Sequence, residues 1–214
     1  MMFRLLKIRV NFLSVDHLNE LMQCRYILED DFTTTCRCVL ECLECNQTSI
    51  TSETYILLPV PLSVDSQSSI DLFLVPEHLS RDGGWRCSSC HRPVEANKTY
   101  IFEELPKILI LQLKRFHQRP DGQYTKSTVP VIPNPEIDVS TVHPQTNVIN
   151  VINYSLNATI HHSGNFQAGH YTASVLQGND WLYCNDSAVD PINFDEIDID
   201  TIYVLVYKRD TVRE

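Results

Sequence analysis

Two pairs of cysteines have the spacing of metal-binding knuckles. The first pair is Cys42 and Cys45 in CLEC, and the second is Cys87 and Cys90 in CSSC. A CxxC turn lets two thiolates converge on one ion, and two such turns complete a closed tetrahedral site of four sulfur atoms for Zn²⁺. Because the pairs are far apart in the chain, the binding free energy of the ion would count as folding free energy. We therefore predict a structural zinc site.

Other cysteine chemistries are possible for these positions. The pairs could form disulfides or remain independent buried thiols, although paired cysteines in a reducing compartment more often bind metal than each other. His91, which follows the second pair, is an alternative ligand. Cys36 and Cys38 alternate with Arg37 in a β-prone run, so we predict that they are ordinary strand residues, with metal ligation as the alternative.

A second chemical pattern lies in QAGHYTASVLQGNDWLYCNDSAV, residues 167–189. Gly178 and Asn179 form a two-residue hairpin turn signal. With that turn, and with side chains alternating between the two faces of a strand, His170 and Asn185 become diagonal neighbours on one face. Their backbones would then be about 7 Å apart, within reach of their side chains.

This pairing is what a catalytic imidazole requires. A histidine base must be held in one tautomer by a hydrogen-bond acceptor, and an asparagine carbonyl oxygen leaves the other ring nitrogen free. A slip of one residue in the turn would replace Asn185 by Asp186, so Asp186 is the alternative partner. A purely structural role for His170 is the other interpretation. Glycines at 164 and 169 allow close approach of a backbone or ligand and favour the functional one.

The elements that must position these side chains are mostly strands. Apolar spacing from Leu18 to Leu28 predicts a helix in an N-terminal segment, residues 1–31. Residues 69–79 suggest one or two helical turns, and the five prolines of 118–150 predict loops with one short strand at 128–132. Strands are predicted at 33–40, 49–60, 106–116, 147–164, 169–177, 180–186 and 201–209. The fold class is therefore α+β and β-rich.

Composition excludes several partners. The formal net charge is −10, from 17 basic and 27 acidic residues, and the basic residues are scattered, which argues against binding of nucleic acid or anionic membranes. No window reaches the roughly 18 to 20 apolar residues of a membrane span. The apolar start is interrupted by Arg4, Lys7 and Arg9, unlike a signal peptide. We therefore predict an intracellular protein, cytoplasmic and/or nuclear, without nucleic-acid or membrane partners.

The motifs occur in the order CxxC, CxxC, LPKILILQLKRF, GHYTASV, WLYCNDSAV and YVLVYKR. This order resembles the C-terminal portion of a ubiquitin-specific protease catalytic domain, a papain-like cysteine peptidase, from about Phe32 to Lys208. The resemblance implies a palm sheet at about 100–209 and zinc-binding β-ribbon fingers at about 33–100, with the thumb mostly absent. Residues 32–210 would form this partial domain, and residues 1–31 match poorly.

The resemblance also implies roles for individual residues. The four knuckle cysteines would bind the zinc of the fingers that grip ubiquitin. His170 matches the general base, Asn185 the third triad member, and Asp186 the adjacent acid that can assist. Gly169 and Tyr171 match positions that line the channel for the Gly-Gly tail of ubiquitin. The implied partner is therefore ubiquitin or a ubiquitinated protein.

The nucleophile of the family lies in a glycine-rich box that opens a helix, and we find no such box in this sequence. Cys24 precedes the fingers but falls within a predicted helix without glycines. Cys184 borders Asn185 but would point away from His170. His162 matches a family histidine that we expect to be structural. We therefore predict that the chain carries the His and Asn half of the site and is inactive by itself.

Three functions remain open on this basis. The chain is the C-terminal half of a cysteine deubiquitinase, as a fragment or truncated isoform. Alternatively, it is a catalytically inactive ubiquitin-binding or scaffold module. A third hypothesis is a zinc-stabilised β domain in which the hairpin is structural only.

Overall fold

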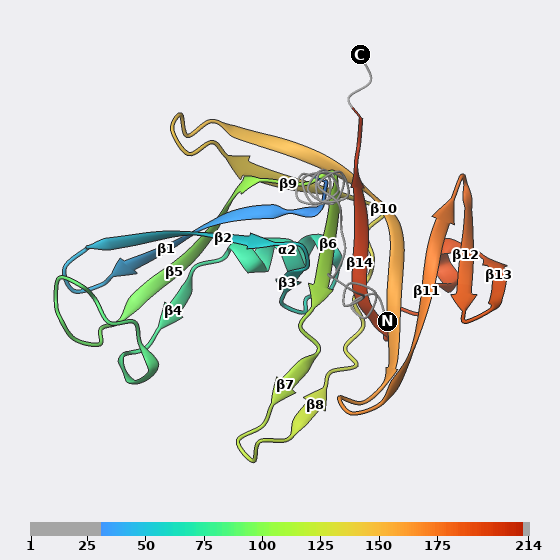
Figure 1. Cartoon of the computed structure of the whole chain (residues 1–214), viewed down its shortest axis with the longest axis horizontal. Helices are drawn as coiled ribbons and strands as arrows, with labels where there is room; N and C mark the ends of the chain where they lie inside the picture. Colours follow the sequence, from blue (N-terminus) through green and yellow to red (C-terminus); the bar gives the residue numbers. More distant parts are fainter. Residues whose placement is uncertain (1–30, 212–214) are drawn as a thin grey trace, which may run out of the picture.

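The computed structural model describes residues 31–211, which form mainly β-strands (Figure 1). A four-stranded sheet, the small sheet, has the order β2-β1-β5-β4. An eight-stranded sheet, the large sheet, follows the path β13-β12-β11-β10-β14-β6-β3, with β9 paired to β10. This architecture confirms the predicted β-rich fold class. Within the described residues, no helix is both long enough and apolar enough to span a membrane.

The small sheet extends to the left in Figure 1 as a long antiparallel ribbon. Its strands are β1 (Thr34–Cys42), β2 (Thr48–Tyr55), β4 (Glu77–Leu79) and β5 (Ala96–Glu104). Cys36 and Cys38 are buried on one face of β1, as alternation along a strand predicts. Burial raises the pKa of the Cys36 thiol to about 12. This thiol therefore stays protonated at neutral pH and cannot serve as a nucleophile.

The large sheet contains most of the apolar core. Its strands are β3 (Leu58–Val60), β6 (Ile108–Leu113), β9 (Glu136–Val142), β10 (Ile149–Gly164), β11 (Gly169–Gln177), β12 (Asp180–Asn185), β13 (Ala188–Ile192) and β14 (Ile202–Arg209). Only β3 and β6 pair in parallel among these described strands. Leu109, Leu111 and Leu113 of β6 are fully or almost fully buried, and β6 lies between β14 and β3, which confirms the predicted central strand in 106–116.

One helix joins the two sheets. Helix α2 (Ser66–Leu74) begins where the Asp65 carboxylate accepts a hydrogen bond from the Ser68 N–H at 2.7 Å, an N-terminal cap. Its buried Phe73 stacks on Tyr100 of β5, with ring centroids 4.7 Å apart. The helix begins three residues before the predicted range of 69–79, and the end of that range forms β4 instead.

The prediction for residues 118–150 is wrong in part. A hairpin of β7 (Phe116–Gln118) and β8 (Tyr124–Lys126) extends from the large sheet, and β9 forms a seven-residue strand. No strand forms at 128–132, where Ile132 makes only an isolated bridge. Four of the five prolines of this region precede β9 and Pro144 follows it, so none interrupts the strand, and β9 is stabilised by pairing with β10.

The predicted strand 49–60 is divided into β2 and β3 because the chain passes there from the small sheet to the large one. Strand β3 therefore belongs to the large sheet although it lies within the range expected for the fingers. The bounds of fingers and palm otherwise remain predictions. The helix expected in 1–31 lies outside the described residues.

Candidate catalytic and metal sites

The β11–β12 hairpin has the register that the sequence predicts. Gln177 pairs with Asp180, and Ala173 pairs with Cys184. Gly178 occupies the first turn position with φ +65°, the left-handed conformation that a two-residue hairpin turn requires and that glycine adopts without strain.

His170 and Asn185 form a hydrogen bond in this hairpin, with 2.7 Å between His170 Nε2 and Asn185 Oδ1. The amide oxygen can only accept, so Nε2 carries the proton and Nδ1 has the free lone pair. Within residues 31–211, Nδ1 has no hydrogen-bond partner, and both side chains are exposed. The imidazole is therefore oriented by Asn185 and available to take a proton from another molecule.

The alternative partner, Asp186, lies in the tight turn that follows β12. It adopts φ +52°, is exposed, and makes no hydrogen bond with His170. The one-residue slip therefore does not occur. Cys184 faces the opposite side of the strand from Asn185. No cysteine sulfur in the described part of the chain hydrogen-bonds to His170, and Cys24 lies outside that part.

Beneath this hairpin lies a polar network that the sequence analysis did not identify. His161 is only 3% exposed. Its Nδ1 lies 3.1 Å from Thr201 Oγ1, and its Nε2 lies 2.9 Å from Thr159 Oγ1 and 3.2 Å from Ser174 Oγ. Burial lowers the pKa of His161, although the nearby Asp198 opposes the shift. The neutral ring thus links β10, β11 and the segment before β14. The sequence signal for a buried histidine was the pair His161–His162 within a predicted strand.

We expect the His161 network to make stability depend on pH. Because the folded pKa lies below the unfolded value of 6.5, the contribution of His161 is complete above that pH and is lost as the pH falls toward the folded pKa. His161→Gln should therefore reduce the loss of unfolding free energy between pH 7 and pH 5. Urea denaturation at several pH values measures the unfolding free energy of both proteins. If that free energy changed with pH equally in the two proteins, the prediction would be wrong.

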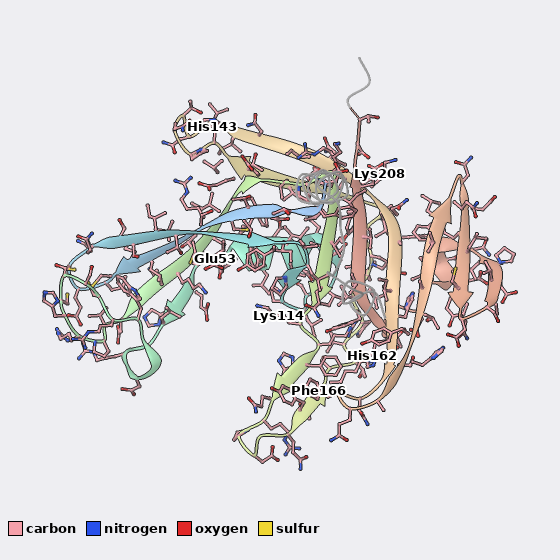
Figure 2. The ribbon with its side chains drawn as sticks, viewed as in Figure 1. Glu53, Lys114, His143, His162, Phe166 and Lys208 are labelled. Carbon is pink, nitrogen blue, oxygen red and sulfur yellow. The ribbon has the colours of Figure 1, made fainter. Side chains whose placement is uncertain are left out.

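His162 lies on the other face of β10 within an aromatic cluster (Figure 2). It is 3% exposed, and its ring centroid lies 4.7 Å from Tyr171, 5.7 Å from Phe116 and 6.1 Å from Tyr203. Burial, and then the Lys126 charge, lower its pKa. These contacts agree with the structural role expected for His162. Tyr171 itself is 55% exposed.

Gly169 permits this arrangement. A Cβ at this position would lie 2.0 Å from His162 Nε2 and 2.6 Å from the Ser163 carbonyl oxygen. A methyl group would therefore force His162 and the β10–β11 turn apart. Packing against His162 thus requires glycine at this position, in addition to the channel role implied by the family resemblance.

Gly169→Ala should therefore destabilise the protein by about 1–3 kcal/mol, the usual cost of overpacking. It should also shift the imidazole NMR signals of His162. Gly178→Ala is the control, since nothing lies within 4 Å of its added Cβ although φ is +65°. That variant should lose stability through backbone strain alone and leave the His162 signals in place. Unchanged His162 signals in Gly169→Ala would contradict the predicted clash.

Arg115 was also missed by the sequence analysis. Its side chain is completely buried, and its guanidinium donates to the carbonyl oxygens of Ile202 at 2.5 Å and Val129 at 2.7 Å. It also lies 3.4 Å from the Ile199 carbonyl oxygen. Burial lowers its pKa, opposed by Asp200 and then Asp198. Arg115 therefore joins the segment after β8 to the segment before β14, which in turn contacts His161.

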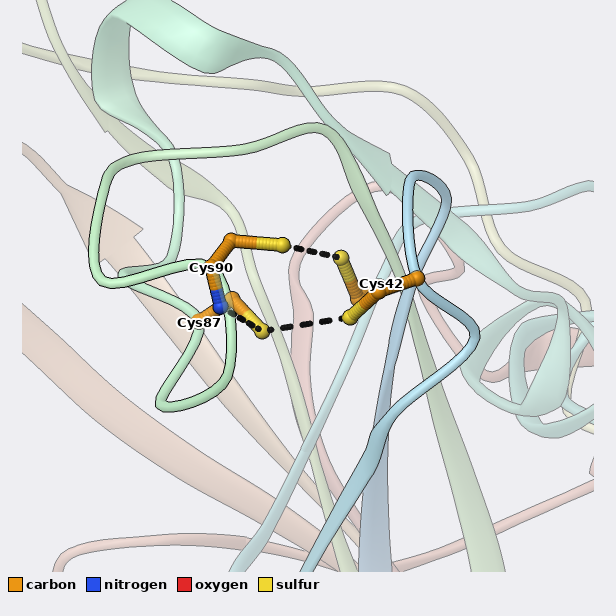
Figure 3. A group of neighbouring side chains, drawn as sticks. Cys42, Cys87 and Cys90 are labelled. Atoms are coloured by element: carbon orange, nitrogen blue, oxygen red, sulfur yellow. Dashed lines mark hydrogen bonds between the residues drawn. The ribbon is translucent and has the colours of Figure 1, made fainter.

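The four knuckle cysteines meet at the far end of the small sheet (Figure 3). Cys42 Sγ and Cys90 Sγ are 3.9 Å apart, and Cys45 Sγ and Cys87 Sγ are 3.7 Å apart. All four sulfur atoms lie within 4.8 Å of one another. These separations are far longer than a disulfide bond, and the cysteines are free. They agree with the sulfur–sulfur distance of about 3.8 Å in a tetrahedral site with bonds of about 2.3 Å.

The two knuckles have the same backbone geometry. Asn46 N–H donates to the Cys42 carbonyl oxygen at 3.0 Å, and His91 N–H donates to the Cys87 carbonyl oxygen at 2.9 Å. Asn46 and His91 have φ of 58° and 55°, so each second cysteine is followed by a left-handed residue. A backbone hydrogen bond from Gln47 lowers the pKa of Cys45 to about 7, which favours the thiolate form. His91 is exposed and is not in the cluster, so the cysteines could hold a metal ion without it.

The family described as Ubiquitin carboxyl-terminal hydrolase matches residues 5–207. Ubiquitin carboxyl-terminal hydrolase 9 of Arabidopsis thaliana is 34% identical over 152 residues, which is 69% of this chain and 16% of the relative. Probable ubiquitin carboxyl-terminal hydrolase 4 of Schizosaccharomyces pombe is 31% identical over 186 residues, 81% of this chain and 31% of the relative. The chain thus spans less than a third of the length of these relatives.

Solved structures share the fold. The yeast SAGA DUB module with an Sgf73 mutant aligns with a TM-score of 0.77 at 24% identity, covering 94% of this chain and 47% of the other. The Ubp8/Sgf11/Sus1/Sgf73 DUB module bound to ubiquitin aldehyde aligns with a TM-score of 0.73 at 23% identity, covering 92% and 48%. The family match extends over nearly the whole sequence. This chain belongs to the ubiquitin carboxyl-terminal hydrolase family, as its resemblance to ubiquitin-specific proteases predicts.

Proposed function

We propose that this chain supplies the general-base half of a thiol-dependent deubiquitinase, which hydrolyses the bond after the C-terminal glycine of ubiquitin. The observation that carries the proposal is the 2.7 Å hydrogen bond between His170 Nε2 and Asn185 Oδ1 on an exposed face. A histidine with one nitrogen held by an acceptor and the other free is the arrangement that activates a thiol nucleophile. Family membership supports the same chemistry.

In the proposed mechanism, Nδ1 of His170 takes the proton of a cysteine thiol. The thiolate attacks the carbonyl carbon of the terminal glycine of ubiquitin, and a carbon–sulfur bond forms. The carbon–nitrogen bond then breaks, and His170 returns the proton to the leaving amine. Water activated by His170 finally hydrolyses the thioester. Asn185 keeps the imidazole oriented throughout, and Asp186, the next residue, is the proposed assisting acid although it makes no hydrogen bond with His170 in this structure.

Gly169 and Tyr171 are the proposed contacts for the tail of ubiquitin. Gly169 has no side chain to obstruct an extended peptide, and Tyr171 is 55% exposed next to it. A narrow channel bounded by a glycine and an aromatic ring would accept a Gly-Gly tail and exclude tails with larger side chains.

Zinc is the proposed ion of the Cys42, Cys45, Cys87 and Cys90 cluster. Four thiolates form a soft, closed donor set that suits structural Zn²⁺ and leaves no position for substrate. When bound, the ion would supply folding free energy to the end of the small sheet. The four cysteines would hold the two knuckles together so that this sheet can act as the fingers that grip ubiquitin.

The enzyme proposal can be tested with ubiquitin that carries a C-terminal electrophile. The chain is incubated with this probe alone and together with the polypeptide that precedes the matched region in the S. pombe relative. We expect an adduct on a cysteine of the added polypeptide, formed more slowly with His170→Ala. Mass spectrometry identifies the labelled cysteine. Absence of an adduct in both mixtures, or equal labelling with His170→Ala, would refute the proposal.

A second candidate is a non-catalytic ubiquitin-binding or scaffold module. It is supported by the absence of a cysteine sulfur bonded to His170 within residues 31–211. Calorimetry of the chain with ubiquitin tests it, and no heat of binding at millimolar ubiquitin would exclude it. In either case we propose ubiquitin or ubiquitinated proteins as partners and an intracellular location, cytoplasmic and/or nuclear.

A further inference from the structure

A groove lies at the end of the β11–β12 hairpin that is remote from His170. It has a volume of about 690 Å³, and its lining includes Asp180, Trp181, Leu182, Ile192 and Phe194. The groove is therefore formed by the start of β12, the end of β13 and the beginning of the 3-10 turn η3 (Phe194–Glu196). Neither the proposed catalytic residues nor the cysteine cluster contribute to it.

Two aromatic side chains, Trp181 and Phe194, line the groove. Trp181 is half-buried and pairs across the strands with Ile192. Its ring centroid lies 5.6 Å from that of Phe194, with an interplanar angle of 48°. An indole face of this kind can accept the aliphatic stem of a long side chain and attract a cation at its tip.

The groove has one acidic lining residue, Asp180, and the sequence around it is acidic and free of lysine and arginine. Residues 127–207 contain no lysine or arginine but include nine aspartates and glutamates. Asp180 lines the groove, Asp190 and Asp195 are exposed on the adjoining residues, and Glu196 accepts hydrogen bonds from Asn193. The field at the groove therefore favours lysine or arginine side chains and repels acidic ones.

The groove is connected to the proposed catalytic residues by an open strand. Among the described strands, β13 is the last of the large sheet, so an extended segment can lie along its outer edge, where Pro191 has no N–H to donate. β12 has six residues, from Asp180 beside the groove to Asn185, a length of about 17 Å at roughly 3.4 Å per residue. Asp190 lies along this route, and Asp186 lies at its end.

We propose that this acidic groove binds an extended segment containing lysine or arginine in the protein that carries ubiquitin. A cationic side chain would lie over Trp181 with its charge beside Asp180, while the segment follows β13 toward His170. The groove lies at the opposite end of β11 from Gly169, so the tail of ubiquitin is assigned to a different place. The binding of a basic peptide in this groove does not depend on the proposed function. The assignment of that peptide to the protein that carries ubiquitin does rest on it.

Binding is tested first without catalysis. A fluorescein-labelled lysine- and arginine-rich peptide is titrated with the chain and with Asp180→Asn/Asp195→Asn. We expect about tenfold weaker binding by the double variant, and weaker binding by both proteins as salt increases. Glu136→Gln removes one acidic charge from an exposed position on β9 and should change affinity less than twofold. Equal affinity of the double variant, equal binding of a glutamate-rich peptide, or no binding would overturn the groove assignment.

The source of the segment is tested in the enzyme complemented with a nucleophile-bearing polypeptide. The double variant should raise KM about tenfold for ubiquitin joined to the basic peptide and leave KM unchanged for ubiquitin joined to a small fluorophore. An equal rise for both substrates would assign the groove to ubiquitin itself and overturn the proposal. Loss of turnover in the parent protein would instead indicate failure of the enzyme hypothesis, and the peptide titration would still decide the groove.

Discussion

His170→Ala should lower kcat/KM for ubiquitin–fluorophore hydrolysis by about 10²- to 10⁴-fold, the usual contribution of a positioned general base. The variant removes the nitrogen that we propose takes the thiol proton, and the thiol would then stay largely protonated at neutral pH. Because both His170 and Asn185 are exposed, the substitution should leave the thermal midpoint nearly unchanged. The measurement uses the chain complemented with the nucleophile-bearing polypeptide, under excess enzyme.

Asn185→Ala is the matched variant for this experiment. It removes one neutral hydrogen bond, worth about 1 kcal/mol, so we expect kcat/KM to fall on the order of tenfold. Asp186→Asn should have a smaller effect because the structure gives Asp186 no hydrogen bond with His170. If Asn185→Ala left the rate unchanged and Asp186→Asn abolished it, the assignment of Asn185 as the orienting residue would be wrong.

Cys87→Ser should abolish stoichiometric zinc binding and unfold the end of the small sheet. Cys87 is completely buried, and its Sγ is 3.7 Å from Cys45 Sγ. Structural zinc in peptide-sized sites has an apparent binding free energy of about 10–16 kcal/mol at neutral pH, so losing one of four thiolates should remove most of the stabilisation. Metal analysis and thermal denaturation, each with and without a chelator, measure the effect.

Cys184→Ser is the control for that variant. Cys184 is half-buried in β12 and lies outside the four-cysteine cluster, so its substitution should retain one zinc ion per chain and a chelator-sensitive transition. Identical melting of the parent protein with and without chelator would contradict the structural role of zinc. Zinc retained by Cys87→Ser would contradict the ligand assignment.

Local patterns explain why both candidate sites could be placed from the sequence. The turn at Gly178 and Asn179, together with the two-residue period of strands, determines which side chains of a hairpin share a face. His170 and Asn185 needed no other information to be paired. Each CxxC turn likewise brings its own two thiolates together by short-range geometry. Their meeting in one cluster depends on strands β1 and β5 pairing next to each other.

Features that depend on distant segments were not predictable in this way. β9 forms where proline-rich sequence predicts loop, because a neighbouring strand supplies its hydrogen bonds. A fully buried arginine such as Arg115 is rare. Only the tertiary structure brings it the carbonyl oxygens of segments near 129 and 202. His161 similarly receives its partners from residues 159, 174 and 201.

The sequence by itself therefore determined which residues are candidates for chemistry and which family they belong to: a histidine with its asparagine, four cysteines suited to one metal ion, and a β-rich chain of the ubiquitin carboxyl-terminal hydrolase family. Only the tertiary structure decided what surrounds those residues, including the buried His161 network and the acidic groove at Trp181. The reason is physical. Turn geometry and side-chain alternation act over a few residues, whereas burial and the shape of a groove depend on strands that meet from distant parts of the chain.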